Sequence, residues 1–468
     1  MGKSMSQRRP QIEATPHPGQ ILDVEGQDLD RQGRGLARWQ SWVIVVPDLL
    51  PGEQARVQIQ QRQRSHWLAR RQTLTETSRF RRRPPCILAA DCGGCSLQHL
   101  DDQAQLSWKQ NTLIETMRRL GEFDAKSDPP IANLTRSIAY RNRALIPLRR
   151  DQNNVLRLGY YKRGSHRIIN LNRCPVLDPR LDELINPLKQ DLQDSGWPAD
   201  HDLQMSGGLR HLGLRVGHHT GDLLITLVSS DRELPGLKGL ATKWMDRWPK
   251  LRGVTLNLQP KHNNLILGTK TDLIAGSETI EEYICGQRLR LTSTTFFQIN
   301  TPQAEAIIRV LTAWVDQMAP SGRVVDAYSG IGTISLPLAA RGLQVHGIEV
   351  HPSSVKQARH NACLNSLEDR CSFEAGDVAE RLADILSDAE ALIVDPPRRG
   401  LEAKVIDTIL GAPPKYFAYL SCDPATQARD LKELLEPKGI YRLQKLQPVD
   451  FFPQTTHLES LALMERIK

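Results

Sequence analysis

The alternation of hydrophobic and polar positions divides the chain into stretches of different texture. Residues 11–75 are rich in short β-type runs with outward polar positions, over 19–24, 41–47 and 52–60. Evenly spaced short strands of this kind predict a small β-barrel. Residues 102–121 carry apolar positions at helical spacing and end at a glycine, which predicts a helix. A mixed, mostly β region follows from 140 to about 291.

From about residue 301 the pattern changes to alternating apolar strands and helices. The expected strands begin near 324, 345, 372 and 392, with a helix over 334–341. This alternation predicts a parallel sheet with crossover helices. We therefore expect an α/β protein with three parts: a barrel at 11–75, a central α+β region at 76–290 and an α/β domain at 291–468. The helix at 102–121 is expected to dock on the last of these.

Positive charge is concentrated near the start of the chain. The 468 residues carry a net charge of +8, and residues 1–90 alone hold 15 basic and 8 acidic residues. Between Arg56 and Arg83 every basic residue is an arginine. Arginine matches phosphate oxygens in a bidentate manner, so a polyanion is the favoured partner, and we expect a folded nucleic-acid-binding module. The alternative is a solvated, solubility-giving segment.

The chain contains no apolar run approaching the ~18–20 residues of a membrane-spanning helix. Its first ten residues lack the apolar core of a secretory signal. We expect a cytoplasmic protein without a membrane partner, and the sequence indicates no obligate protein partner.

A glycine-containing turn follows the first strand of the α/β domain, in the segment Asp326-Ala-Tyr-Ser-Gly-Ile-Gly-Thr333. Glu349 lies 23 residues after Asp326, at the tip of the next strand, where a carboxylate can bind ribose hydroxyls. A structural turn or a nicotinamide site would share this pattern. Further acidic strand ends, Asp377 and Asp395 in Asp-Pro-Pro-Arg-Arg-Gly, make it similar to an S-adenosylmethionine (SAM)-dependent methyltransferase.

Two later blocks extend the likeness: Ser421-Cys422-Asp423-Pro424 and Asp450-Phe-Phe-Pro-Gln-Thr-Thr-His-Leu-Glu459. Together with Asp-Pro-Pro-Arg-Arg-Gly they resemble the RNA uracil-5 methyltransferases, and the whole chain resembles the iron–sulfur subgroup that modifies 23S ribosomal RNA. The resemblance implies a class I, Rossmann-like methyltransferase domain preceded by a TRAM-type, OB-like barrel and an iron–sulfur region.

The chemistry of uracil explains why such an enzyme needs a thiol and a base. Carbon 5 is a poor nucleophile until a thiolate adds to carbon 6 and places negative charge on carbon 5. Carbon 5 then attacks the methyl group of SAM, and a base removes its proton so that the thiolate can leave. The resemblance assigns Cys422 as the nucleophile and Glu459 as the base. We expect nearby positive charge, with Arg398 as the candidate, to favour the thiolate.

The resemblance also implies a set of cofactor-site residues. The polar candidates at the junction of cofactor and base are Gln298 and Asp395, while Phe296 and Phe297 are expected in the core more often than stacked on a base. The full predicted cofactor set is Gln298, Tyr328, Gly330, Thr333, Glu349, Asp377 and Asp395.

Four cysteines give the spacing C-x5-C-x2-C-x78-C: Cys86, Cys92, Cys95 and Cys174. Four thiolates suit either tetrahedral zinc or a four-iron cluster, and spacing does not choose between them. The resemblance selects a [4Fe–4S] cluster, with zinc as the alternative. Because methyl transfer has no redox step, we expect such a cluster to organise the RNA-binding region.

The sequence departs from the family pattern at a few positions. Asp423 follows the nucleophile where asparagine is common, and Tyr328, Ser329 and Thr333 replace phenylalanine, cysteine and asparagine in the glycine turn. Three other functions stay open: transfer to a uridine in tRNA, a base N-methyltransferase, because Asp-Pro-Pro-Arg resembles that motif, and an RNA-binding assembly factor without catalysis.

Overall fold

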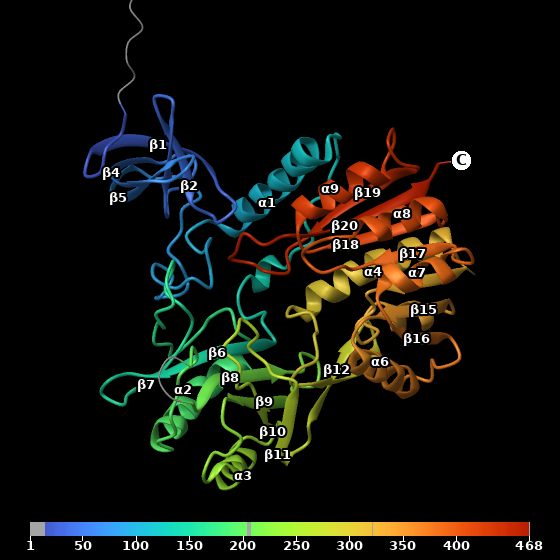
Figure 1. Cartoon of the computed structure of the whole chain (residues 1–468). Coiled ribbons are helices and arrows are strands. Elements are labelled where there is room, and N and C mark those ends of the chain that lie inside the picture. The colour runs from blue at the N-terminus through green and yellow to red at the C-terminus, as the bar shows by residue number, and fades with distance from the viewer. Residues whose placement is uncertain (1–14, 204–206, 321, 468) are drawn as a thin grey trace, which may run out of the picture. The chain divides into compact units, whose positions relative to one another are not determined.

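The computed structural model describes residues 15–203, 207–320 and 322–467. These residues form two compact units (Figure 1). The barrel unit contains the described residues up to Ala89, together with Cys95–Gln105 and Gln454–Thr456. The catalytic unit contains Ala90–Gly94, Leu106–Pro453 and the described residues from His457 onward. Residues 11–14 of the expected barrel lie outside the described residues.

The barrel unit is built on a closed five-stranded barrel with the order β1-β2-β3-β5-β4. Its inward positions alternate along the strands, as in β1 and β4, and form a core that includes Leu22, Val24, Val57 and Ile59. The expected strands are present, and two further strands complete the closure. The bounds are β1 Ile21–Leu29, β2 Gly35–Trp39, β3 Trp42–Val46, β4 Gln54–Arg62 and β5 Trp67–Glu76.

The middle of the chain forms a six-stranded sheet and a separate hairpin within the catalytic unit. The sheet order is β11-β10-β9-β8-β6-β7, and β12 pairs only with β13. Two helices accompany these strands, α2 Pro179–Asp194 and α3 Leu237–Arg247. The strands are β6 Arg143–Arg150, β7 Leu156–Leu158, β8 Leu209–Val216, β9 Leu223–Ser229, β10 Leu251–Leu258, β11 Lys270–Gly276, β12 Thr279–Ile284 and β13 Gln287–Thr292.

The last third forms a seven-stranded sheet with the order β16-β15-β14-β17-β18-β20-β19. Strands β14 to β18 are parallel, and β20 runs antiparallel between β18 and β19. The order reverses at β14, which creates the switch point where such sheets bind ligands. The strands are β14 Arg323–Ala327, β15 Gln344–Glu349, β16 Cys371–Ala375, β17 Ala391–Val394, β18 Tyr416–Ser421, β19 Tyr441–Val449 and β20 Glu459–Arg466.

Both faces of this sheet are covered, so successive strand residues enter different cores. Val324 and Ile393 pack with helices α4, α5 and α6, whereas Val325 and Leu392 pack with α7, α8 and α9. Fully buried strands of this kind are typical of parallel α/β sheets. The helices are α4 Thr301–Met318, α5 Ser335–Ala339, α6 Pro352–Leu364, α7 Val378–Leu386, α8 Ala403–Gly411 and α9 Pro424–Leu434 (Figure 1).

The helix expected at 102–121 is observed as α1, Asp102–Thr116, which continues as a π-helical turn over Met117–Gly121. Leu113 and Met117 are fully buried in the core formed with α7, α8 and α9. A short 3-10 turn, Leu134–Arg136, follows. Among the helices of the described residues, none combines the length and apolar character needed to cross a membrane.

Candidate active site

The turn after β14 is shaped by left-handed backbone conformations. Tyr328 has a φ of 69°, and Gly330 and Gly332 have φ values of 56° and 87°. Such a conformation is uncommon for a tyrosine and is concentrated at functional sites. The Gly330 N–H donates to Glu349 Oε2 at 3.2 Å, and the His351 N–H donates to Glu349 Oε1 at 2.8 Å. Two backbone donors therefore orient the Glu349 carboxylate beside the glycine turn.

A buried carboxyl group lies beneath this turn. Asp326 is only 1% exposed, and its Oδ2 accepts a hydrogen bond from the Ser335 hydroxyl. Burial, together with the charge of Glu349, raises the pKa of Asp326 to about 7, although the hydrogen bonds from Ser335 act to lower it. Asp326 Oδ1 has no hydrogen-bond partner although it is buried. An unsatisfied buried oxygen at this position is suited to a polar group of a ligand.

One cavity of about 580 Å³ brings the predicted residues together. It opens at the carboxyl ends of β14, β15, β17 and β18, where the sheet order reverses. All nine residues named from the sequence as catalytic or cofactor-binding line it: Gln298, Tyr328, Gly330, Thr333, Glu349, Asp377, Asp395, Cys422 and Glu459. The sequence motifs, which span more than 160 positions, therefore converge on one volume large enough for a nucleoside-sized ligand.

Helix caps position two of the acidic residues. Asp377 caps α7 by accepting a hydrogen bond from the Ala379 N–H at 2.9 Å. Asp423 caps α9 in the same way, with its Oδ1 2.8 Å from the Ala425 nitrogen. Aspartate and asparagine serve equally well at an N-cap. The departure from the family's asparagine at 423 therefore leaves the start of α9 intact.

The nucleophile and the base candidates are set by strand register. Antiparallel pairing places Ser421 of β18 opposite Ser460 of β20, so the next residue on each side is Cys422 and Glu459. Gln427 of α9 stabilises this end of the sheet, because its Nε2 donates to the carbonyls of Tyr419 and Ser460 at 3.0 and 3.1 Å. The two reactive side chains thus enter the cavity from adjacent strands.

The electrostatics of the two groups are dominated by burial. Burial, together with the nearby carboxyl groups of Glu459 and Asp395, raises the pKa of Cys422 to about 11, although Arg398 acts to lower it. Burial and Asp395 also hold the pKa of Glu459 well above its ordinary value. The expectation that positive charge would favour the Cys422 thiolate is therefore wrong for the ligand-free cavity. Arg398 acts in the expected direction, but desolvation and two carboxylates outweigh it.

These shifts predict how Cys422 reacts in the absence of a ligand. Since its pKa is about 11, we expect alkylation by iodoacetamide to be slow at neutral pH and to rise about tenfold per pH unit. A SAM analogue with a positive charge at the sulfonium position should accelerate alkylation at neutral pH, whereas neutral S-adenosylhomocysteine should not. Mass spectrometry can compare Cys422 with the exposed Cys363 as an internal reference. Equal rates at neutral pH would contradict this prediction.

The loop that carries Gln298 is held from the central sheet. Asn142 Nδ2 donates to the Gln298 carbonyl at 2.9 Å. Arg143 and Arg215 donate to the carbonyls of Ser293 and Thr295 just before it. Arg215 is 4% exposed, and burial lowers the pKa of its guanidinium, as does the charge of Arg143. Carbonyl acceptors on a neighbouring loop compensate part of the cost of burying these cations.

The two phenylalanines of this loop have different environments. Phe297 is 3% exposed and belongs to the core with α4, which agrees with the expectation of a core position for this residue. Phe296 is 72% exposed and lines the cavity. An exposed aromatic ring at the cavity is available to stack on a base.

Several lining residues were not assigned a site role from the sequence. Asp326 opens the glycine-turn motif, but its burial beneath the turn does not follow from the sequence pattern. Phe452 and His457 lie within the second block, and the centroids of their rings are 5.5 Å apart. The further lining residues without an assigned role include His351, Ser354, Arg399 and Glu402.

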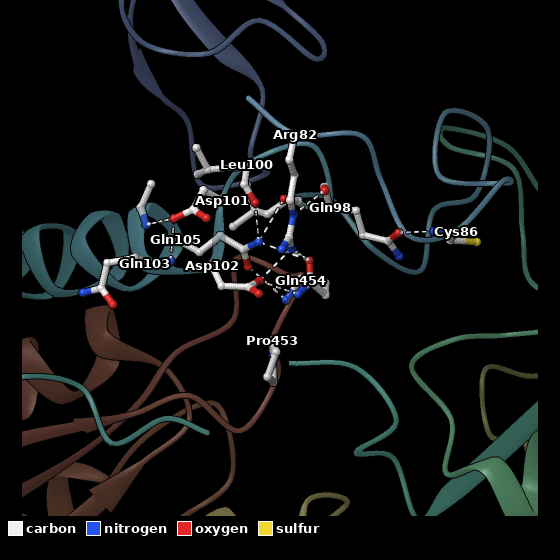
Figure 2. Close-up of polar contacts among 12 residues, drawn as sticks. Arg82, Cys86, Gln98, Leu100, Asp101, Asp102, Gln103, Gln105, Pro453 and Gln454 are labelled. Carbon is white, nitrogen blue, oxygen red and sulfur yellow. Dashed lines mark hydrogen bonds and ion pairs between the residues drawn. The ribbon is translucent and has the colours of Figure 1, made fainter. Parts of the chain in front are cut away.

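The four clustered cysteines are divided between the two units: Cys86 and Cys95 in the barrel unit, Cys92 and Cys174 in the catalytic unit. The Cys86 N–H donates to Gln98 Oε1 at 3.1 Å (Figure 2). Cys92 Sγ accepts the Gly94 N–H at 3.4 Å, which is the kind of contact that orients metal-bound thiolates. No group of three or more His, Cys, Asp or Glu side chains arranged for a metal ion is found within the described parts of the chain.

Fold and cavity together define a class of protein. The sheet order, the glycine turn with its adjoining Glu349 and the acidic ends of β16 and β17 are those of a SAM-dependent methyltransferase. More narrowly, the chain belongs to the tRNA (uracil-5-)-methyltransferase family, whose model matches residues 101–467. It is a SAM-dependent enzyme that transfers a methyl group to uracil in RNA.

Similar proteins agree with this assignment. The chain is 61% identical over 452 residues to an uncharacterized RNA methyltransferase of Parasynechococcus marenigrum, with 97% of each chain covered. It is 33% identical over 452 residues to an uncharacterized RNA methyltransferase of Bacillus cereus, covering 96% of this chain and 97% of the relative. Its fold matches the Pyrococcus abyssi tRNA (uracil-54, C5)-methyltransferase bound to S-adenosyl-L-homocysteine, with a TM-score of 0.76, 24% identity, and coverage of 95% and 100%.

Proposed function

We propose that the protein methylates carbon 5 of one specific uridine in 23S ribosomal RNA through a covalent enzyme–RNA intermediate. The observation that carries the covalent mechanism is the shared cavity of Cys422 and Glu459, on adjacent strand ends, with Asp395 and the glycine turn. The choice of 23S RNA depends on the resemblance to the iron–sulfur subgroup.

In the proposed reaction the Cys422 thiol first gives its proton to water, and the thiolate sulfur then bonds to carbon 6 of the uracil. The electron pair of the C5–C6 bond moves onto carbon 5 and the adjoining carbonyl. Carbon 5 attacks the methyl group of SAM. The bond between that methyl group and the sulfonium sulfur breaks, and S-adenosylhomocysteine is released. Glu459 takes the proton from carbon 5, the double bond re-forms and the thiolate leaves.

The surroundings of the two groups fit these steps. A carboxylate whose pKa is raised by burial is a stronger base than one in water, so Glu459 suits the removal of a carbon-bound proton. Thiolate formation requires a counter-charge, and the positive sulfonium of SAM would add to that of Arg398 in the cavity. A base inside folded RNA must be swung out of its stack to reach this cavity.

The proposed target is tested by mapping 5-methyluridine in total RNA by mass spectrometry. Cells that lack the gene should lose the modification at one position of 23S RNA, and complementation by the wild-type chain should restore it. Loss from tRNA with an unchanged 23S RNA would instead establish the tRNA alternative. An N-methylated base in place of 5-methyluridine would overturn the proposed chemistry.

We further propose that Cys86, Cys92, Cys95 and Cys174 hold a [4Fe–4S] cluster. The donor set supports this, since four thiolates suit such a cluster and two of the residues, Cys95 and Cys174, are buried. When bound, the cluster would crosslink segments of the chain.

Substitution of one ligand tests this assignment. Anaerobically purified wild-type protein should contain about four irons per chain and show the broad visible absorption of an iron–sulfur centre. Cys95→Ser should lose most of both, whereas Cys371→Ser, a buried cysteine outside the set, should retain them. Stoichiometric zinc without iron in anaerobically purified protein would favour the alternative metal.

A further inference from the structure

The loop between β19 and β20 is longer than a hairpin requires. The strands pair as far as Val449 opposite Glu459, so nine residues, 450–458, connect them. Hairpin loops usually have about 2–5 residues and a turn geometry of their own. A loop of nine residues depends on contacts with other elements. Glu459 forms the last pair of this ladder, next to the loop, so contacts that hold the loop add to strand register in placing its side chain.

Four successive carbonyls of the loop accept hydrogen bonds from outside it. The acceptors are the carbonyls of residues 451–454. The donors are, in order, Asn300 Nδ2 at 3.1 Å, Lys109 Nζ at 3.2 Å, the Tyr140 hydroxyl at 3.1 Å, and the N–H groups of Ser96 and Leu97 at 3.0 Å each. Such external bonding replaces the turn bonds that a short hairpin would make within itself.

Within the catalytic unit, a buried ion pair holds the first half of the loop. Lys109 of α1 is 0% exposed, and its Nζ lies 2.6 Å from Asp450 Oδ1. The same ammonium donates to the Phe452 carbonyl. A buried cation with two directed acceptors is costly to rearrange, because either partner left alone would be a desolvated charge. Lys109 thus defines the path of the chain over Asp450 and Phe452.

Within the barrel unit, Gln454 forms the centre of a polar network (Figure 2). Its Oε1 accepts hydrogen bonds from Arg82 Nη2 at 2.7 Å and Gln105 Nε2 at 3.1 Å, and its Nε2 donates to Asp102 Oδ1 at 2.8 Å. The Gln454 N–H donates to Gln105 Oε1 at 3.0 Å. Gln454 is fully buried with a φ of 70°. A left-handed glutamine persists only where its surroundings over-determine it.

From these observations we infer that Lys109 and Gln454 are positioning residues for the base step: they fix the loop 450–458 so that Glu459 meets the carbon 5 proton. Neither side chain lines the cavity, and both act through the chain that leads to Glu459. This inference rests on the proposed role of Glu459. Release of the loop would displace the base while leaving Cys422 and the cofactor residues, which are on other elements, in place.

The inference predicts a specific kinetic defect. In Gln454→Ala and Lys109→Met, transfer of the first methyl group should remain near the wild-type rate, but turnover should fall roughly tenfold to a hundredfold, as expected for a misplaced catalytic group. A denaturation-resistant protein–RNA adduct carrying the methyl group should accumulate. The measurements are single-turnover and steady-state release of S-adenosylhomocysteine, with the adduct quantified on denaturing gels using the full-length protein and unmodified RNA.

A matched control lies on the same helix. Gln110 of α1 donates its side-chain amide hydrogen bonds to the carbonyls of Ser127 and Asp128, which lie outside the loop, so Gln110→Leu should show wild-type partitioning. Gln105→Leu removes the hydrogen bonds between Gln105 and Gln454 while leaving Gln454 in the chain. If Gln454→Ala does not fold, Gln105→Leu replaces it in the test and should show the same kinetic defect.

The outcomes separate the two proposals. A parallel loss of first transfer and turnover, or an unchanged turnover in the loop variants, would overturn the positioning role. If Glu459→Gln accumulates the adduct but these variants do not, only the positioning role fails. If Glu459→Gln itself accumulates none, the assignment of Glu459 fails first.

Discussion

Replacing Cys422 by alanine should lower methyl transfer to RNA by about four orders of magnitude or more, the scale seen when a covalent nucleophile is removed. Without the sulfur, carbon 5 never gains the electron density needed to attack the methyl group. Binding of S-adenosylhomocysteine should be unchanged, because the turn at Gly330 and the carboxylate of Glu349 are intact. Transfer of labelled methyl to RNA and calorimetric binding of the cofactor product measure the two effects.

Cys285 provides a matched control for this experiment. It is half-buried like Cys422, and burial likewise raises its pKa to about 11, but it lies outside the cavity. Cys285→Ala should therefore retain full activity. RNA with 5-fluorouridine at the target should become covalently attached to wild-type and Cys285→Ala protein, and not to Cys422→Ala. Substantial methylation by Cys422→Ala would contradict the covalent mechanism.

Glu459→Gln should stop the reaction after the first methyl transfer and leave the protein covalently attached to the RNA. The amide keeps the shape of the side chain but cannot accept the carbon 5 proton, so the methylated uracil should remain bonded to Cys422. We expect about one methyl group transferred per protein, a stable adduct with ordinary uridine RNA, and turnover reduced about a thousandfold or more. Intact-mass spectrometry of the adduct would show the added methyl group directly.

The same substitution should change the pH dependence of stability. The pKa of Glu459 is raised from its ordinary value of 4.5 by burial, so the folded protein holds this proton more tightly than the unfolded chain. Stability from this group is present at low pH and is lost as pH rises from about 4.5 toward the folded pKa. Glu459→Gln should therefore melt at a higher temperature than wild type at neutral pH, with a smaller difference near pH 4.

A second buried carboxyl group supplies the control for Glu459. Glu282 is 0% exposed and its pKa is also raised by burial, but it lies outside the cavity and accepts hydrogen bonds from the N–H groups of His218 and His219. Glu282→Gln should form no adduct with ordinary RNA. Normal turnover by Glu459→Gln, or an adduct with both variants, would contradict the assignment of the base.

The sequence predicted a large part of the fold because burial imposes local patterns. Alternation along 21–29 and 54–62 reflects one buried face of a strand, and the apolar runs of β14 and β17 reflect strands covered on both faces. The nine site residues could be named because short motifs in the chain resemble those of the RNA uracil-5 methyltransferases, and the chemistry of uracil explains why a thiol and a base belong among them. The structure brings all nine into one cavity.

Other features arose only from tertiary packing. The unsatisfied oxygen of Asp326 and the raised pKa of Cys422 depend on how much water the folded chain excludes, which no local pattern records. Lys109 and Asp450 are 341 positions apart, and Gln105 and Gln454 are 349 apart. In the sequence Lys109 is one more polar residue of the helix predicted over 102–121.

Short-range periodicity by itself determined most of the elements, and short motifs pointed to the groups that we propose for the chemistry. The tertiary structure decided how far burial shifts the pKa values of Cys422 and Glu459, and which contacts hold the loop before Glu459. The physical reason is that secondary structure and motifs depend on neighbours along the chain, whereas desolvation and long-range hydrogen bonds exist only after distant segments have packed together.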